Sequence, residues 1–403
     1  MLRILVSGAG IAGAAFAAML ARSGHQVTLV ESASSPRRGG QAVDLRGAGR
    51  TVVERIGLMP ECQKVTLSQR GIAMVAADGR FLATMPVDAF DGEGIISEIE
   101  ILRGDMSNVL LEASMPNVDH RFGDRITELT QDDQGVDVVL ASGGRERYDL
   151  LIGADGVSSG VRRLIFGESG FTPFGLVTSW FTVPDPGDLD DWYLMFNAPG
   201  GRTASIRPGR VAGEAKAALS ARVAAGERLP RDAAGRQAFW DARFAGVGWR
   251  VPRLLEQMGS ADDVAFSPVG QVKLPRWSRG RVTLIGDAAA CPSPLTGLGT
   301  SVALVQAYVL AGELAARTRW DAKDLAEAME RYEQICRPYV TQAQELPPGG
   351  VGGYAPRTAT MIRLRTLSMA MMSRWPMRPI LQRQFDKAGD IDLPSYPNLH
   401  ATS

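Results

Sequence analysis

Histidine and cysteine are scarce in this sequence of 403 residues. It contains three of each, and no histidine lies close in sequence to another histidine or to a cysteine: the positions are His25, His120, His400, Cys62, Cys291 and Cys336. This spacing argues against a metal site and against a catalytic triad built on histidine, so no catalytic residue can be assigned from these types. Few, widely spaced cysteines are typical of free thiols in a reducing compartment.

The sequence also lacks an excess of either charge and a long apolar run. Lysine plus arginine and aspartate plus glutamate each number 44, so no overall electrostatic argument favours nucleic acid or an anionic membrane as a partner. The apolar stretch at 4–20 is interrupted by three glycines, and a membrane span needs about 20 apolar residues. The first motif begins almost at residue 1 and leaves no room for a cleavable signal peptide, so we expect a cytoplasmic protein.

The first 31 residues predict a strand, a glycine-rich turn, a helix and a second strand. An apolar run at 2–7 precedes Gly-Ala-Gly-Ile-Ala-Gly at 8–13, and an alanine-rich helical stretch follows at 14–23. A second buried strand at 26–30 ends on Glu31. Strand, glycines, helix, strand and terminal acid in this order form the dinucleotide-binding fingerprint.

Each part of this unit has a physical role beside a dinucleotide. Gly8 permits the tight turn, Gly10 lets the backbone approach a pyrophosphate, and Gly13 lets helix and strand pack closely. Ala12 lies at the helix start, where free N–H groups and the positive helix end would meet the phosphate charge. Glu31 can accept hydrogen bonds from a ribose diol, and an acid here disfavours a 2′-phosphate. The fingerprint therefore predicts FAD or NAD rather than NADP.

Two further buried strands, at 149–156 and 281–287, run into Asp155-Gly156 and Gly286-Asp287. Between them, at 172–266, prolines and glycines punctuate strand-like runs, which indicates a second, β-rich domain. Hydrophobic residues at 45% and charged residues at 22% are ordinary for a globular protein, and 403 residues are enough for two domains or one elaborated domain.

Three motifs in this order resemble those of the class A, or p-hydroxybenzoate hydroxylase-type, flavoprotein monooxygenases. They are Gly8/Gly10/Gly13 with Glu31, Asp155-Gly156 with Arg162, and Gly286-Asp287. The resemblance spans about residues 2–345. Three other stretches are similar to the branch that includes the tetracycline-inactivating monooxygenases and actinomycete polyketide-type hydroxylases: residues 39–45, Leu102-Arg103-Gly104-Asp105 and Leu393-Pro394-Ser395-Tyr396-Pro397.

The resemblance implies a role for each matching residue at FAD. Glu31 would hold the adenosine ribose, Arg103 would contact the ribityl and phosphate region, and Asp287 would hydrogen-bond the ribityl or pyrophosphate part. Arg103 could instead be a surface residue at a helix start.

Other matches concern the reductant and the flavin ring. Asp155 belongs to a motif associated with FAD and with transient NAD(P)H binding, and Arg162 would be structural or near the approach of the nicotinamide. Asp155 and Arg162 could instead simply pair across a helix start. Asp44 and Arg46 match a segment beside the isoalloxazine ring, although Asp44 could also be an ordinary loop acid.

The loop at 292–299 adds an argument that does not depend on resemblance. It feeds a helix starting near Thr300, whose positive end would point at the pyrimidine edge of the flavin. Reduced flavin carries negative charge there, and free backbone N–H groups would stabilise it. Gly297 and Gly299, with Leu298 between them, let the backbone come close.

One position departs from the family pattern. Many relatives have a histidine as the fifth residue of Gly-Asp-Ala-Ala-His, and this sequence has Ala290, followed by Cys291. The group that handles protons is therefore unassigned. Cys291 is best interpreted as a small buried residue rather than a reactive one.

We therefore expect an α/β fold: a doubly wound, Rossmann-like FAD-binding domain with an inserted β-rich substrate domain and a C-terminal helix. The FAD-binding domain would comprise 1–70, 101–171 and 271–345, the substrate domain 71–100 and 172–270, and the C-terminal helical segment 346–403. Residues 361–385, rich in methionine and arginine, could form a helix packed across both domains, a substrate lid or an interfacial helix.

The resemblance implies a monooxygenase that uses FAD, with NADPH or NADH as reductant. It would hydroxylate a phenolic or polyketide-like small molecule through a flavin C4a-hydroperoxide, as a monomer or dimer. Two alternatives stay open: a reductase of the geranylgeranyl-reductase type, which works without O₂, and a non-enzymatic carrier on the same fold. The complete set of phosphate-binding glycines counts against the carrier.

Overall fold

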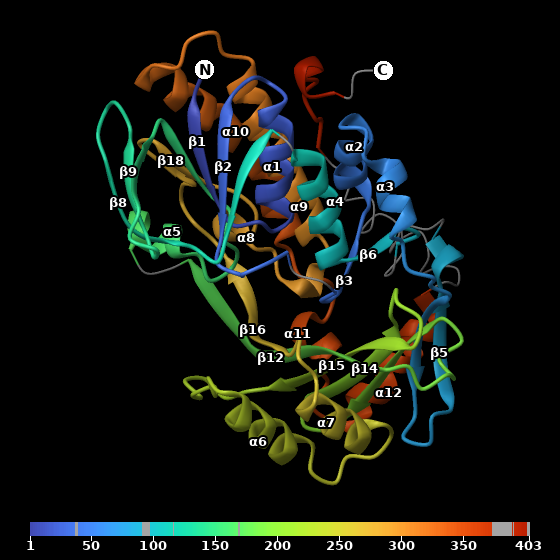
Figure 1. Cartoon of the computed structure of the whole chain (residues 1–403). Coiled ribbons are helices and arrows are strands. Elements are labelled where there is room, and N and C mark those ends of the chain that lie inside the picture. The colour runs from blue at the N-terminus through green and yellow to red at the C-terminus, as the bar shows by residue number, and fades with distance from the viewer. Residues whose placement is uncertain are drawn as a thin grey trace.

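A computed structural model of the chain describes residues 1–36, 39–90, 97–115, 117–167, 170–372, 389 and 391–400. The fingerprint strands lie at the centre of a six-stranded sheet, in the order β17-β18-β11-β1-β2-β7 (Figure 1). Neighbouring strands are parallel except for the β17–β18 pair. The strands are β1 (Arg3–Ser7), β2 (Gln26–Glu31), β7 (Val118–Phe122), β11 (Leu150–Gly153), β17 (Ser278–Arg279) and β18 (Val282–Leu284).

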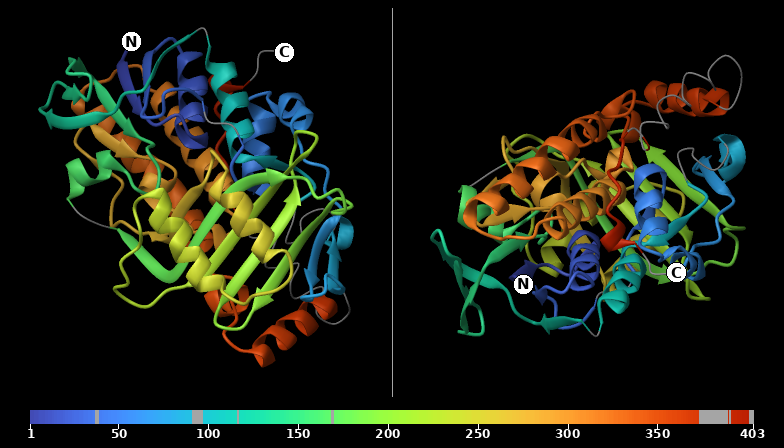
Figure 2. Two further views of the ribbon diagram at one scale, coloured as in Figure 1. Left: turned by 60° about the horizontal axis from the view of Figure 1, so that its bottom comes forward. Right: turned by 90° about the horizontal axis from the view of Figure 1, so that it is seen from above.

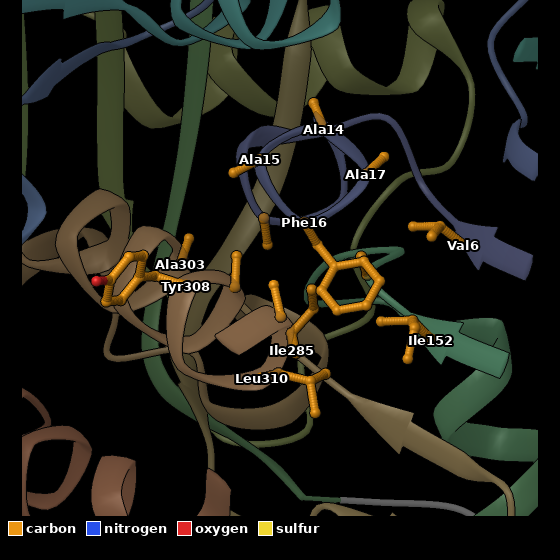
Figure 3. Close-up of a cluster of buried hydrophobic side chains, with 14 of the residues drawn as sticks. Val6, Ala14, Ala15, Phe16, Ala17, Ile152, Ile285, Ala303, Tyr308 and Leu310 are labelled. Carbon is orange, nitrogen blue, oxygen red and sulfur yellow. The ribbon is translucent and has the colours of Figure 1, made fainter. Parts of the chain in front are cut away.

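Helix α1 (Ile11–Ala21) lies in the middle of the first hydrophobic core. All its residues from Ile11 to Leu20 are buried, because it packs between α4 (Arg103–Ser114) and α9 (Gly299–Ala315). Its alanines allow this close packing, and Phe16 supplies the volume by pointing at Ile152 and Ile285 (Figure 3). A 22-residue helix, α10 (Ala322–Ala343), covers the outer side of α9.

A second, seven-stranded sheet has the order β16-β12-β15-β14-β13-β4-β5. Its pairs are antiparallel except for β13–β4, which is parallel. The strands are β4 (Gly71–Val75), β5 (Phe81–Pro86), β12 (Phe171–Pro184), β13 (Trp192–Ala198), β14 (Arg202–Pro208), β15 (Glu214–Arg222) and β16 (Ala265–Val272). Strands β12 and β16 run from this sheet toward the six-stranded one (Figure 1).

The two faces of the seven-stranded sheet differ in character. One carries apolar side chains that pack on α6 (Ala233–Phe244) and α7 (Val251–Gly259), which lie across it in Figure 2, left. The other face carries polar side chains on β14 and β15 and an apolar cluster at β4 and β5. Helix α11 (Gly350–Tyr354) covers part of the polar region, where the hydroxyls of Tyr354 and Ser220 share a hydrogen bond. Helix α12 (Ala359–Met372) packs on β5 and β13.

Smaller elements complete the fold. A three-stranded antiparallel sheet is formed by β8 (Ile126–Gln131), β9 (Val136–Leu140) and β10 (Arg145–Tyr148), and a two-stranded one by β3 (Ala42–Asp44) and β6 (Glu100–Leu102). The short helices are α2 (Gly47–Arg55), α3 (Met59–Lys64), α5 (Gly160–Phe166), α8 (Asp287–Ala290), η1 (Val87–Phe90), η2 (Pro294–Thr296) and η4 (Pro397–Leu399).

The C-terminal residues 391–400 return to the helices beside the six-stranded sheet, where Tyr396 packs against α9. The hydroxyl of Tyr396 donates to Glu313 at 2.7 Å. The ring lies so close to the backbone of α9 that a Cβ on Gly312 would be 2.2 Å from it. Of the predicted helix at 361–385, α12 accounts for the part up to Met372, and 373–385 lies outside the described residues.

The predicted mixed α/β architecture, with a Rossmann-like parallel sheet and a separate mainly antiparallel one, is confirmed. One local expectation differs, because the strand predicted at 281–287 ends at Leu284. Gly286, at φ +61°, turns the chain so that Asp287 begins α8 instead of ending a strand. The domain boundaries stay a prediction. Within the described part of the chain, no helix combines the length and apolar character that a bilayer crossing requires.

Candidate functional site

The turn between β1 and α1 requires two of its glycines for purely steric reasons. Gly8 has φ +107°, and a Cβ on it would lie 2.5 Å from the carbonyl oxygen of Ala154. A Cβ on Gly13 would lie 2.0 Å from the carbonyl oxygen of Gly8. These distances leave no room for a side chain at either glycine. Because the glycines lack a Cβ, the turn can pack directly against the end of β11, and Asp155 lies beside the fingerprint.

Gly10 is different, because open space lies where its side chain would be. It is the N-cap of α1, with extended backbone angles and no side-chain cap. The nearest atom to its ideal Cβ is Nη2 of Arg103, at 3.9 Å. The first turn of α1, which includes Ala12, has N–H groups without intrahelical acceptors. A cation and a helix N-terminus thus flank a gap without a side chain, which fits the pyrophosphate of a dinucleotide.

Glu31 is held against the same turn at the end of β2. Its Oε2 accepts from the N–H of Ala9 at 2.9 Å, and its Oε1 accepts from the N–H of Ala33 at 2.9 Å. The side chain is only partly buried, and a carboxylate has about four acceptor sites. Its Oε1 also accepts from the hydroxyl of Ser32 at 3.1 Å, so Glu31 is fixed at the position where the fingerprint predicts a ribose diol.

Arg103 and Asp287 reach this region from two other helices. Arg103 begins α4, and its N–H donates to the carbonyl of Gln41 at 2.9 Å. Asp287 begins α8, which packs so tightly that a Cβ on Gly286 would lie 2.7 Å from the Cβ of Ala12. Burial and then the charge of Asp287 raise the pKa of the Cys291 thiol well above its usual value, while Arg103 opposes this shift. Cys291 therefore stays protonated, which argues against a nucleophilic role.

Asp155 and Arg162 bind backbone groups. Asp155 accepts from the N–H groups of Gly160 at 2.7 Å and Val161 at 3.0 Å, so it caps the start of α5. Arg162 is buried and donates to the carbonyl of Ala288 at 3.0 Å, within α8. Among the described residues the two form no direct ion pair. Arg162 thus supports the helix that carries Asp287.

Asp44 and Arg46 form a buried ion pair of 2.8 Å at the end of β3. Asp44 also accepts from the N–H of Ser97 at 2.9 Å. Its Oδ2 lies 3.4 Å from the ideal Cβ position of Gly297, so the pair adjoins the loop before α9. These residues are consequently more than loop charges, because they are packed against the loop predicted to approach the flavin ring.

The loop before α9 has the backbone shape that its glycines predicted. Gly297 adopts the left-handed conformation at φ +69°, Leu298 is the N-cap of α9 without a side-chain cap, and Gly299 is its first residue. The N-terminal N–H groups of α9 have no intrahelical acceptors. The structure thus brings together all the predicted residues, in two adjoining groups. Gly8, Gly10, Ala12, Gly13, Glu31, Arg103, Asp155 and Asp287 surround the turn, and Asp44, Arg46, Gly297, Leu298 and Gly299 surround the start of α9, with Arg162 behind α8.

One supporting residue, Gln306, is not among those predicted from the sequence. The side chain of Gln306 in α9 is fully buried, and its Oε1 accepts from the N–H of Gly286 at 2.7 Å. This bond fixes the turn that presents Asp287. Gln306 is the one amide side chain in an otherwise largely apolar helix, and a buried amide needs a hydrogen-bond partner. This pattern could have indicated a supporting role.

The comparisons agree with this geometry. The family model described as FAD binding domain matches residues 1–346. The chain is 33% identical to the FAD-dependent monooxygenase asL6 of Sarocladium schorii over 422 residues, which cover 98% of each chain. It is 32% identical to the tetracycline destructase Tet(55), with 98% of each chain covered and a TM-score of 0.80. Klebsiella pneumoniae HpxO, complexed with FAD and uric acid, shares the fold at 22% identity, with 98% of each chain covered and a TM-score of 0.76.

Of the two dinucleotides that the fingerprint allows, FAD is therefore the one that this site binds. The helix N-termini and Arg103 supply donors beside the gap at Gly10, which suits the pyrophosphate, and the carboxylate at the end of β2 supplies an acceptor, which suits the ribose. The family match covers the residues that build this site, and the match to asL6 extends over nearly the whole chain. The chain belongs to the FAD-dependent monooxygenases of the FAD-binding-domain family.

Proposed function

We propose that this monooxygenase hydroxylates a phenolic or polyketide-like small molecule with NADPH or NADH and O₂. The observation that carries the proposal is the gap at Gly10, bordered by Arg103, together with the polar sheet face that lies next to the same region. The name of the neighbour Tet(55), a tetracycline destructase, supports a polycyclic phenolic substrate. We further propose that the protein works in the cytoplasm as a monomer or dimer.

The polar face of the seven-stranded sheet is the proposed substrate wall. Tyr193, Ser205 and Lys216 lie on this face, on the strands whose alternate residues pack on α6 and α7. Tyr193 donates to Ser205 at 3.2 Å. Lys216 Nζ is 3.1 Å from the ideal Cβ position of Gly39, and the carbonyl of Gly39 accepts from Gly104 in the first turn of α4. This wall therefore adjoins the cofactor region, and its hydroxyls and ring suit a ligand with phenolic oxygens.

When bound, FAD would supply the redox chemistry and the activation of O₂. The chain supplies position and electrostatics. The N–H groups at the start of α9 would stabilise the negative charge of the reduced ring. Asp287 would hold the ribityl chain, and the wall would orient the electron-rich carbon and exclude water.

The test begins with the cofactor. Purified protein should be yellow and should release FAD on acid precipitation, because the covalent alternatives would need a reactive histidine or cysteine. Compounds would then be screened for faster NADPH or NADH oxidation with coupled O₂ uptake. Under ¹⁸O₂ the product should carry one labelled atom. Turnover at full rate without O₂, giving an unlabelled product two hydrogens heavier, would assign the reductase instead. A colourless protein that binds no FAD would favour the carrier.

A further inference from the structure

A buried ion pair outside the cofactor turn joins the two parts of the fold. Arg207 of β14, in the seven-stranded sheet, donates from Nη1 to Glu100 of β6 at 3.0 Å, and its Nη2 bonds the other carboxylate oxygen. The side chains of Arg207 and Glu100 are only 8% and 6% exposed. Both oxygens of Glu100 thus face one guanidinium in the interior, which is the strong, bidentate form of this interaction.

Arg207 contacts residues of the proposed substrate wall. Its guanidinium is 5.1 Å from the centre of the Tyr193 ring, and Nη2 also bonds Gln69. Its Nε has no acceptor among the described residues. Arg207 therefore connects the wall with the small sheet of β3 and β6.

The surroundings of Glu100 lie on the cofactor side. In the β3–β6 pair, Glu100 is directly opposite Asp44, which pairs with Arg46 and adjoins the loop at Gly297. Four charges thus form a row, Arg46, Asp44, Glu100 and Arg207, in which two neighbouring carboxylates lie between two guanidinium groups and the charges sum to zero. The row runs from the segment predicted beside the isoalloxazine ring to the substrate wall.

Stability alone is a weak reason for such an arrangement. Desolvating two charges costs several kcal/mol per ion, and apolar replacements of buried pairs are often neutral or stabilising. Burial raises the pKa of Glu100, and the facing Arg207 opposes that shift, so the carboxylate depends on its partner for its charge. In a poorly polarisable interior, a single uncompensated charge also acts over a longer distance than in water.

We propose that Glu100 and Arg207 are a positioning pair that balances the charge around Asp44 and Arg46 and thereby sets the reduction potential of the bound flavin. The inference rests on the proposed place of the ring beside Asp44. Reduced flavin is anionic at neutral pH, so its stability depends on the net charge of this row. Removing one partner changes that net charge by one unit, whereas removing both leaves it unchanged.

Two variants separate this role from a structural one. Glu100→Gln keeps the shape and an acceptor but leaves Arg207 uncompensated, so the midpoint potential of bound FAD should become more positive. In the double variant Glu100→Met/Arg207→Met the row is neutral again, and the potential should return close to that of the wild type. Potentials are measured by dye-equilibrated reduction of the FAD-loaded protein without substrate, and unfolding midpoints of the apoproteins are recorded in parallel.

Glu146→Gln is the matched control, because Glu146 also pairs with an arginine, Arg121 at 2.5 Å, but in the peripheral strand β10. This variant should leave the potential unchanged. The inference is overturned if Glu100→Gln leaves the potential unchanged, or if the double variant is displaced as far as the single one. Those results would leave the proposed function intact, since ¹⁸O₂ incorporation tests it separately. Failure of the wild type to bind FAD would overturn both.

Discussion

Replacing Gly10 should remove FAD binding while leaving the fold intact. An ideal Cβ at this position meets only the tip of the Arg103 side chain, at 3.9 Å, and the backbone angles are extended and open to any residue. The folded apoprotein therefore has room for alanine or valine. The added side chain would stand in the gap through which the pyrophosphate approaches the helix N-terminus.

The magnitudes follow from this geometry. Glycine is a better N-cap than alanine or valine, so the apoprotein should lose about 1 kcal/mol of unfolding free energy. If the phosphate loses two charge-assisted hydrogen bonds, each contributing about 1.5–3 kcal/mol, binding weakens by about 3–6 kcal/mol. This corresponds to a rise in the FAD Kd of about 10²- to 10⁴-fold, and Gly10→Val should exceed Gly10→Ala.

Gly13→Ala provides the contrast. Its Cβ would lie 2.0 Å from a backbone oxygen, so the turn itself must move, at a cost of about 3 kcal/mol or more. Urea unfolding of the apoproteins and titration of FAD fluorescence give the two quantities for each variant. Wild-type FAD affinity in Gly10→Val would show that the phosphate lies elsewhere. Equal destabilisation by the two substitutions would refute the steric distinction between the glycines.

Three other predictions test parts of the structure away from the turn. Arg162→Met should destabilise the protein by about 2–4 kcal/mol in urea unfolding, because two carbonyls in the interior lose their donor. Burial lowers the pKa of His25 in the folded protein below 6.5. As the pH falls, the unfolded chain therefore binds a proton at a higher pH than the folded protein does. Stability should be complete above pH 7 and fall toward pH 5, and His25→Asn, which keeps an acceptor for the N–H of Leu2, should show a weaker fall. Tyr396→Phe should cost about 1–3 kcal/mol of unfolding free energy because the buried Glu313 loses its hydroxyl donor, and thermal unfolding would detect this loss.

The elements that follow from local pattern were predictable from the sequence. The β1-α1-β2 unit is found where the sequence predicted it. Its prediction depends only on spacing within a short window, in which an apolar run, turn glycines, a helical stretch and a second apolar run follow one another directly. The strand at 281–287 was predicted too long for a related reason. Apolar character continues through Ile285, and only the backbone angle of Gly286 ends the strand.

Contacts between distant segments were not predictable in this way. Strand β4 pairs in parallel with β13, about 120 positions further along the chain, and no local signal specifies that partner. The Glu100–Arg207 pair likewise joins two strands that each appear ordinary in sequence. The candidate site was more accessible to prediction, because the fingerprint concentrates its chemistry in a few adjacent residues and the resemblance supplied the remaining positions.

The C-terminal segment shows where sequence pattern stops being informative. The stretch at 393–397 was noticed as a motif, but its destination on α9 depends on Gly312. Within a helix, glycine weakens the element by about 1 kcal/mol relative to alanine, which would count against it there. In the structure, the missing Cβ opens the slot that the Tyr396 ring fills, and a methyl group would overlap the ring at 2.2 Å. The packing of Tyr396 on α9 therefore requires glycine at 312. This dependence can be recognised only from the three-dimensional structure, because the two residues lie far apart in the sequence.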